Sequence, residues 1–268
     1  GLQTLTAKVI DQAGNVSDAS LGLDVTIDTT GPSVAITPSI SLDTGSDSGD
    51  LLTCDTTLQL SGTVSDTYGV DTVEIRGGVT SLGTAIITGN SWSFTTDILT
   101  EGAHTLTAVA TDKAGNSTTS DGLTVTIDTT APAAPGLDLT DGSDSGVSNS
   151  DDLTKIATPT VYVNFNGAAE FAPVAGDTVT LYADGVSVGS VVLDATDIGS
   201  GGVAVVTESL LEGAQTLTAT VTDQAGNVSD ASTGLPITVD LTAPAAPNID
   251  LVDGSDSGFS NSDNLTQQ

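Results

Sequence analysis

The sequence contains very little cysteine or histidine. Cys54 is the only cysteine among 268 residues, so an intramolecular disulfide is impossible. His104 is the only histidine, and its counterparts in the internal repeats are Gln3 and Gln215. Because a catalytic residue would not be expected to alternate with Gln, we interpret His104 as an exposed strand residue. The sequence therefore predicts a protein without disulfides and without enzymatic activity.

Basic residues are also scarce, with four Lys and Arg against 35 Asp and Glu and a net charge of -31. The four bases form no cluster that could neutralise phosphates, so nucleic acid is excluded as a partner. The sequence has no apolar run of membrane-spanning length and no signal peptide. Because its first residue falls inside a repeat, we expect it to be an excerpt of a longer protein, without membrane insertion.

Aromatic residues make up only 3% of a chain that is 37% hydrophobic, so its cores must consist mainly of Val, Leu, Ile and Ala. All but five of the acidic residues are Asp. A surface selected only for solubility mixes Glu and Lys with Asp. Short Asp side chains grouped in loops indicate ligands for a hard cation, because Ca2+ prefers carboxylate and carbonyl oxygens. The alternative is an acidic surface that serves only solubility.

Internal repeats divide the chain. The tripeptide Ala-Gly-Asn occurs at 13–15, 114–116 and 225–227, at intervals of about 100 to 110 residues. Repeats of this size are domain-sized, so each should have its own core. The predicted division is the C-terminal strands of a truncated module (1–29), two complete modules (30–130 and 131–241) and the N-terminal part of a further module (242–268).

Each complete module contains about seven short alternating segments separated by turn residues. This pattern is typical of an antiparallel β-sandwich of the immunoglobulin-like class. No stretch shows a helical period, so we expect no helix. The predicted fold is all-β, with tandem seven-strand sandwiches joined end to end. In the second complete module the expected strands are 137–139, 158–164, 177–183, 187–193, 202–207, 214–221 and 235–239.

One motif marks the seams between modules. The sequence Val-Thr-Ile-Asp-Thr-Thr-Ala-Pro at 125–132 has close copies at 25–32 and 237–244. Pro cannot donate to a sheet ladder, so each copy marks a connection between modules and not a central strand. The Asp that recurs at every seam indicates that a cation binds there.

These motifs carry a resemblance to a known family. The string E-G-A-x-T-L-T-A-x-x-x-D-x-A-G-N followed by V-T-I-D-T-T-A-P, at 101–132 and 212–244, resembles the bacterial immunoglobulin-like repeats of giant surface adhesins. The string D-G-S-D-S-G-x-S-N-S-D at 141–151 and 253–263 is similar to the same family. Members are exported by type I secretion and often carry RTX sequences. The resemblance implies a calcium-rigidified extender on the bacterial cell surface, which holds a distal ligand-binding domain for cell adhesion or biofilm formation.

Sandwich topology predicts where the acidic motifs meet. The last strand and the Asp-Ser loop after the first strand lie at the C-terminal tip of a module, whereas the D-x-A-G-N hairpin lies at the N-terminal tip. Each seam Asp and Asp-Ser loop should therefore face the hairpin of the next module, with Ca2+ between them. The predicted ligands are Asp128, Asp43, Asp47, Asp223 and Asn227 at the central junction, Asp28, Asp112 and Asn116 at the first junction, Asp141, Asp144, Asp151 and Asp240 at the tip of the second complete module, and Asp253 and Asp256 in the last segment.

Each motif also has a simpler interpretation. D-x-A-G-N alone is a good hairpin sequence, and the Asp-Ser loop alone could be a flexible acidic loop. Their recurrence beside a seam Asp favours the metal hypothesis. The partners expected are the neighbouring modules of the same chain in a monomeric rod. The alternative function is a carbohydrate- or protein-binding module, although the aromatic residues do not recur at matching positions between repeats.

Overall fold

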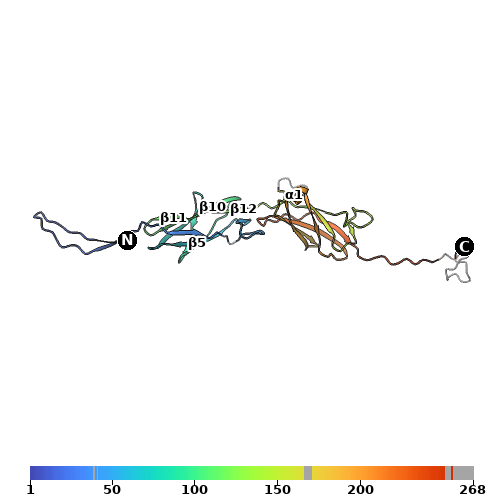
Figure 1. Cartoon of the computed structure of the whole chain (residues 1–268), viewed down its shortest axis with the longest axis horizontal. Helices are drawn as coiled ribbons and strands as arrows, with labels where there is room; N and C mark the ends of the chain where they lie inside the picture. The colour runs from blue at the N-terminus through green and yellow to red at the C-terminus, as the bar shows by residue number, and fades with distance from the viewer. Residues whose placement is uncertain (39, 41, 166–170, 251–254, 256–268) are drawn as a thin grey trace.

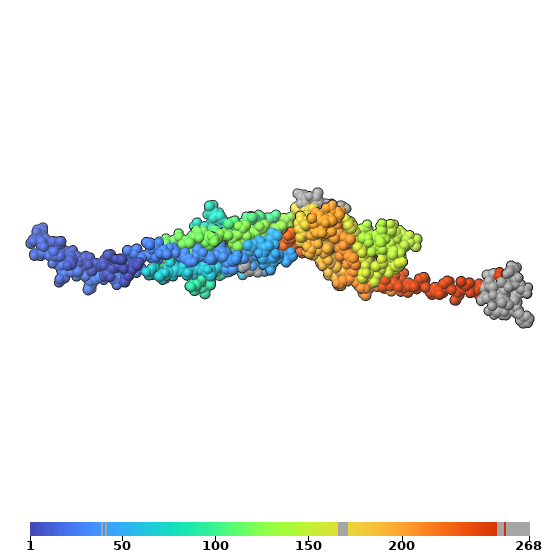
Figure 2. Space-filling view, in the orientation of Figure 1, coloured from blue at the N-terminus to red at the C-terminus, as the bar shows by residue number. Residues whose placement is uncertain are grey.

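The structure is a computed structural model, and it describes residues 1–38, 40, 42–165, 171–250 and 255. Two β-sandwiches follow one another along the long axis of the molecule (Figure 1). The space-filling view shows the same end-to-end arrangement, with a narrow hairpin before the first sandwich and an extended segment after the second (Figure 2). The expected fold class, tandem immunoglobulin-like sandwiches in an all-β chain, is confirmed.

The first complete module consists of two packed sheets. One sheet has the order β3-β5-β9-β8, and the other has the order β4-β12-β10-β6-β7, with β11 also paired to β10. The strands are β3 (Ser33–Ile36), β4 (Leu52–Thr53), β5 (Gln59–Ser65), β6 (Val70–Gly77), β7 (Thr80–Thr84), β8 (Ile86–Thr88), β9 (Ser91–Thr95), β10 (Gly102–Asp112), β11 (Ser117–Thr119) and β12 (Leu123–Ile127).

Alternation of side chains along these strands builds the core. In β5 every second residue is buried, which is the period-2 pattern of a strand with one face toward the core. Leu60 and Val64 lie inside, together with Ile75 of β6 and Leu106 of β10. Trp92 of β9 is 2% exposed and belongs to this core.

The second complete module repeats this plan, and each of its seven expected segments forms a strand. One sheet has the order β13-β15-β18, and the other has the order β14-β20-β19-β16-β17. The additional short strand β14 pairs in parallel with β20, as β4 does with β12. The strands are β13 (Gly136–Leu139), β14 (Leu153–Thr154), β15 (Thr160–Asn164), β16 (Thr178–Ala183), β17 (Val186–Val192), β18 (Gly202–Val206), β19 (Gly213–Thr222) and β20 (Leu235–Val239).

The expectation of no helix was wrong at one place. Helix α1 (Ala195–Ser200) begins after Asp194, whose carboxylate accepts hydrogen bonds from the amides of Thr196 and Asp197. It ends at Gly201, which has a left-handed φ of 76°. Six residues are too few to show a helical period, and the capping residues at both ends specify this helix.

The flanking segments differ from each other. Strands β1 (Leu2–Leu5) and β2 (Leu23–Thr26) form an antiparallel hairpin whose side chains are mostly exposed. Residues 242–250 form no strand and are exposed. Within the described ranges, no helix has the length and hydropathy needed to cross a membrane.

Candidate metal centres at the module junctions

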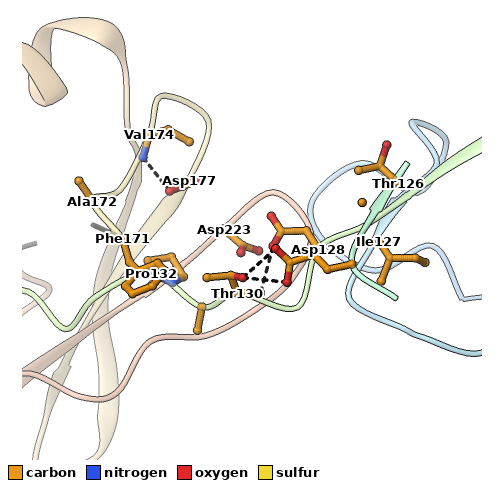
Figure 3. A pocket seen from close by; sticks show the side chains of 13 residues that line it. Thr126, Ile127, Asp128, Thr130, Pro132, Phe171, Ala172, Val174, Asp177 and Asp223 are labelled. Atoms are coloured by element: carbon orange, nitrogen blue, oxygen red, sulfur yellow. Dashed lines mark hydrogen bonds between the residues drawn. The ribbon is translucent and has the colours of Figure 1, made fainter. Parts of the chain in front are cut away.

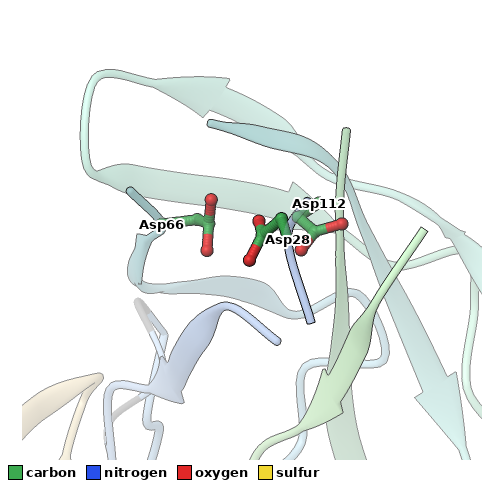
Figure 4. Close-up of side chains that lie close together, drawn as sticks. All are labelled: Asp28, Asp66 and Asp112. Atoms are coloured by element: carbon green, nitrogen blue, oxygen red, sulfur yellow. The ribbon is translucent and has the colours of Figure 1, made fainter. Parts of the chain in front are cut away.

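Three carboxylates meet where the first hairpin joins the first complete module. Asp28, Asp66 and Asp112 each place one carboxylate oxygen within 4.8 Å of the others (Figure 4). Asp28 is the seam residue after β2, Asp66 follows β5, and Asp112 ends β10. Two carboxylates about 4 Å apart repel by about 1 kcal/mol in water, and more where water is excluded. A cation bound among the three would turn this repulsion into attraction.

The D-x-A-G-N hairpin fixes the orientation of its own Asp. Asp112 Oδ1 accepts hydrogen bonds from the amides of Ala114 (2.9 Å) and Asn116 (2.8 Å), and Oδ2 accepts one from Asn116 Nδ2 (2.8 Å). Gly115 supports the turn with a φ of 94°. Burial acts to raise the pKa of Asp112, but the hydrogen bonds from Asn116, Ala114 and Gly115 outweigh it and lower the pKa. The turn therefore holds an ionised carboxylate in a fixed position.

The same hairpin recurs at the central junction. Asp223 Oδ1 accepts from the amide of Asn227 (2.8 Å), and Oδ2 accepts from Asn227 Nδ2 (2.9 Å). Gly226 has a φ of 95°, close to that of Gly115. The motif is therefore both a turn and a holder for an acid, so the two interpretations of the sequence are compatible.

At the central junction, carboxylates from both modules line one cavity of about 490 Å3. Asp128 comes from the seam, and Asp177 and Asp223 come from the second module (Figure 3). Glu101 lines the same cavity and accepts hydrogen bonds from the hydroxyls of Thr129 (2.9 Å) and Thr130 (3.0 Å). Side chains on both sides of the joint thus direct negative charge into a common space.

Asp177 is the most deeply buried of these acids, at 2% exposure. Its Oδ2 accepts a hydrogen bond from the amide of Val174 (2.8 Å), but its Oδ1 is buried without any partner. Burial raises the pKa of Asp177, and the negative charges of Asp223 and Asp128 raise it further. A buried carboxylate oxygen without a partner destabilises the folded state, and a bound cation would give that oxygen a partner.

The two Asn residues predicted as cation ligands act as bridges in this structure. Asn227 Nδ2 donates to the main-chain oxygen of Asp128 (2.8 Å), and Asn116 Nδ2 donates to that of Asp28 (3.3 Å). Each side-chain amide also bonds the Asp of its own hairpin. Because its nitrogen donates to oxygens on both sides, each Asn links two modules directly. These bonds leave out Oδ1, the atom through which an Asn would bind a cation.

The Asp-Ser loop of the first complete module does face the next hairpin, but its contacts there do not involve its carboxylates. Thr44 Oγ1 and the amide of Cys54 (3.2 Å) both donate to the main-chain oxygen of Ala225. A Cβ added at Gly45 would lie 1.9 Å from the main-chain oxygen of Gln224. Only glycine permits this close approach between the two modules.

The carboxylates of that loop remain within it. Asp43 Oδ2 accepts from the amide of Leu51 (3.2 Å), and Asp47 Oδ1 accepts from the amide of Gly49 (3.0 Å). Asp43 and Asp47 are not among the residues that line the cavity with Asp128 and Asp223. The loop reaches the hairpin through the Thr44 hydroxyl and through Gly45, and backbone amides of the loop donate to its acidic side chains.

The remaining predicted ligands lie at the far tip of the second complete module. Asp141, Asp151 and Asp240 are exposed, whereas Asp144 is buried. Asp240 Oδ1 accepts from the amide of Thr242 (3.1 Å), as Asp128 Oδ1 does from Thr130 (3.0 Å). The predicted ligands Asp253 and Asp256 fall outside the described residues.

Sequence reasoning missed Asp66 and Asp177. Asp177 directly precedes β16, and its strand register makes Asp71 the counterpart in the first module. In that module the register shifts beside Asp112, and Asp71 is exposed. Asp66, from the loop before β6, lies among the junction carboxylates instead. In each module the third acid comes from the loop between corresponding strands, β5 and β6 or β15 and β16, but from different positions and sequences, so no repeated motif could reveal it.

Tandem sandwiches with carboxylates gathered at their joints define the class, and sequence comparison gives the family. The family model described as bacterial Ig-like domain matches residues 31–129 and 130–241, so the chain belongs to that family. A search of curated proteins found no match.

Several solved structures resemble the chain. Fibronectin(III)-like modules of CbhA from Clostridium thermocellum share 18% identity over 80% of this chain and 100% of theirs, with a TM-score of 0.46. A 1.5-MDa bacterial ice-binding adhesin shares 21% identity over 88% of this chain and 73% of its own, with a TM-score of 0.38. The structure of a biofilm-associated protein that contains its BSP domain shares 22% identity over 80% of this chain and 30% of its own, with a TM-score of 0.27.

Proposed function

We propose that this chain is a calcium-stiffened spacer within a large bacterial surface adhesin. One observation carries the proposal: the buried Oδ1 of Asp177, which has no partner, belongs to a cavity that Asp128 and Asp223 also line. Asp128 belongs to one module and the other two acids belong to the next. A cation bound there would join the modules, and the group formed by Asp28, Asp66 and Asp112 would do the same at the first junction.

The donor set favours Ca2+ over other metals. Every side chain in the two groups offers carboxylate oxygen, and Ca2+ takes six to eight oxygen ligands at about 2.3–2.6 Å. Zinc prefers nitrogen and sulfur donors in its structural sites. Mg2+ loses its water reluctantly and demands a near-ideal octahedron, so it should substitute poorly. Main-chain oxygens and water would complete the coordination.

The mechanical role follows from charge. In the absence of a cation, acids from two modules share one cavity and repel each other. With Ca2+ bound, the same acids attract a common ion, and the angle between the modules becomes fixed. Each module then adds rigid length, and the expected result is a monomeric rod that holds a distal domain away from the cell surface. Extracellular Ca2+ modules bind at about 10⁻⁴–10⁻³ M, a range suited to that location.

Calorimetric titration of the chelator-treated chain with CaCl2 tests the proposal. Asp223→Asn should weaken binding at the central junction by at least about tenfold, because the charge of the ligands sets Ca2+ affinity. Asp230→Asn is the matched control, since Asp230 is an exposed acid near the same hairpin and lines no part of the cavity. Equal affinities for Asp223→Asn and the parent chain would refute the junction site.

A further inference from the structure

The central joint contains a contact without carboxylates, between the Asp-Ser loop of the first complete module and the hairpin of the second. The main-chain oxygen of Ala225 accepts hydrogen bonds from Thr44 Oγ1 and from the amide of Cys54 (3.2 Å). Ala225 is 1% exposed, although it lies outside the hydrophobic core cluster of its own module. The loop of the neighbouring module therefore covers this alanine.

The other two D-x-A-G-N hairpins show the same alanine without such a loop. In all three hairpins the Asp amide donates to the Asn main-chain oxygen at 2.9–3.0 Å. Ala114 and Ala13, which occupy the same position of the motif, are exposed. A Cβ added at Gly115 would meet no described atom within 4 Å, whereas a Cβ added at Gly226 would lie 2.9 Å from the main-chain nitrogen of Gly45. The hairpins share their internal bonds, so burial of the alanine results from docking.

The contact does not depend on the variable residue of the motif. The acceptor is the main-chain oxygen of Ala225, and Gly45, which has no side chain, lies against the main chain of Gln224. The variable position holds Gln224, Lys113 and Gln12 in the three hairpins. Because the main-chain oxygen and the small alanine are common to all three, each hairpin offers the same acceptor to a loop of this kind.

The second complete module contains the same pair of donors at its far tip. The amide of Lys155 donates to Ser145 Oγ (2.8 Å), as the amide of Cys54 donates to Thr44 Oγ1 (2.8 Å). In both modules the two residues are ten positions apart. The short strand beside them pairs in parallel with the last strand of the module in both cases. Ser145 and Lys155 are therefore the counterparts of Thr44 and Cys54.

In the second complete module these donors are open. Ser145 is half-buried and Lys155 is exposed. Among the described residues, Ser145 Oγ accepts from Lys155 and its hydroxyl has no acceptor, so its proton can be donated to a new partner. The amide of the seam residue Asp240 donates to the main-chain oxygen of Thr154 (2.8 Å), next to Lys155. The seam and the open donors thus lie at the same tip.

We propose that the Ser145 hydroxyl and the Lys155 amide form a docking site for the D-x-A-G-N hairpin of a further bacterial Ig-like module. They bind the main-chain oxygen of its alanine, as the equivalent donors of the first complete module bind that of Ala225. Since this oxygen is common to every copy of the motif, the site accepts the hairpin of either complete module. The order of the modules is therefore not encoded in this contact. The contact involves no cation and does not depend on the proposed calcium function.

Ala225→Leu in the whole chain tests the contact where it is already made. A leucine does not fit under the loop, so exchange of the Cys54 amide should speed up about fivefold, the factor that one hydrogen bond of typical strength contributes. NMR residual dipolar couplings should also show the two modules aligning less as one body. Ala114→Leu is the matched control, because Ala114 has the same place in its hairpin and is exposed. If the two variants gave the same exchange and alignment at one Ca2+ concentration, the inference would be overturned.

A chain in which residues 130–241, the second family match, are repeated once after residue 241 tests the open site. The Lys155 amide of the first copy should exchange about fivefold more slowly than in the parent chain, because the hairpin of the second copy binds there. Ala225→Leu in the second copy should abolish this protection, whereas Ala225→Leu in the first copy should retain it. Unchanged exchange of Lys155 in a folded longer chain would overturn the proposed site. The comparison in the parent chain decides the matter if the longer chain does not fold.

Discussion

Asn227 Nδ2 donates a 2.8 Å hydrogen bond to the main-chain oxygen of Asp128, and the two residues belong to different sandwiches. The same side chain holds the Asp223 carboxylate. One amide thus positions an acid of the second module and also binds the seam of the first. Asn116 makes the corresponding pair of contacts with Asp112 and Asp28. The joint therefore has a direct polar link in addition to any cation.

Removal of this link should loosen the central joint without unfolding either sandwich. Asn227→Ala deletes hydrogen bonds to both sides, and each typical bond contributes about 0.5–1.5 kcal/mol. NMR residual dipolar couplings should then show the two modules aligning less as one body. Asn15→Ala is the control, because Asn15 Nδ2 bonds only Asp11 within its own hairpin. Identical alignment in Asn227→Ala and the parent chain would exclude the link as a determinant of the joint.

Chelation should lower the melting temperature. With Ca2+ removed, the acids in each group repel one another, and binding free energy that stabilised the native state is lost. At a Ca2+ concentration a hundred times the dissociation constant, this free energy amounts to about 2.7 kcal/mol for one site. Differential scanning calorimetry in EDTA, Ca2+ and Mg2+ measures the effect. Ca2+ should raise the melting temperature more than Mg2+ does, and equal curves in EDTA and Ca2+ would argue against bound calcium.

Asp177→Asn should change the melting temperature in opposite directions with and without Ca2+. In chelator the folded-state pKa of Asp177 is raised, so its contribution to stability is greatest below the ordinary Asp pKa of about 3.9 and is lost as pH rises through the folded value. At pH 7 in EDTA the variant should therefore melt above the parent chain, and this difference should shrink as the pH is lowered toward 4. In saturating Ca2+ at pH 7 it should melt below the parent chain, because a ligand is missing.

Asp230→Asn controls for the loss of one negative charge near the same hairpin. It should change the melting temperature little at either pH, because Asp230 is exposed. If Asp177→Asn behaved like Asp230→Asn in all three conditions (EDTA at pH 7, EDTA at pH 4 and Ca2+ at pH 7), Asp177 would have no role in cation binding.

The sequence predicted the fold well because a strand with one buried face leaves a period-2 pattern. All seven segments of the second complete module followed from that pattern and from turn residues. Helix α1 did not, since its capping residues at Asp194 and Gly201 specify it and no period is visible over six residues. Recurrence at the seams likewise indicated Asp128 and Asp223.

The third acid of each junction could not be predicted in the same way. Asp66 and Asp177 come from loops that differ in length and sequence, and a register shift beside Asp112 displaces Asp71, the apparent counterpart. How the carboxylates of the Asp-Ser loop are oriented could not be predicted for a related reason. The motif of that loop indicates where acids gather, but whether Asp43 points across the joint or back to Leu51 depends on the backbone path.

Small-angle X-ray scattering of the whole chain, with Ca2+ and with EDTA, tests the central claim most directly. With Ca2+ the scattering should match one rigid, extended particle, and EDTA should produce the shorter, broader distance distribution of jointed modules. Asp128→Ala should resemble the EDTA state even in Ca2+, while its circular dichroism remains that of folded sandwiches, because Asp128 belongs to neither core. Identical dimensions with and without Ca2+ would contradict the claim that calcium stiffens the chain.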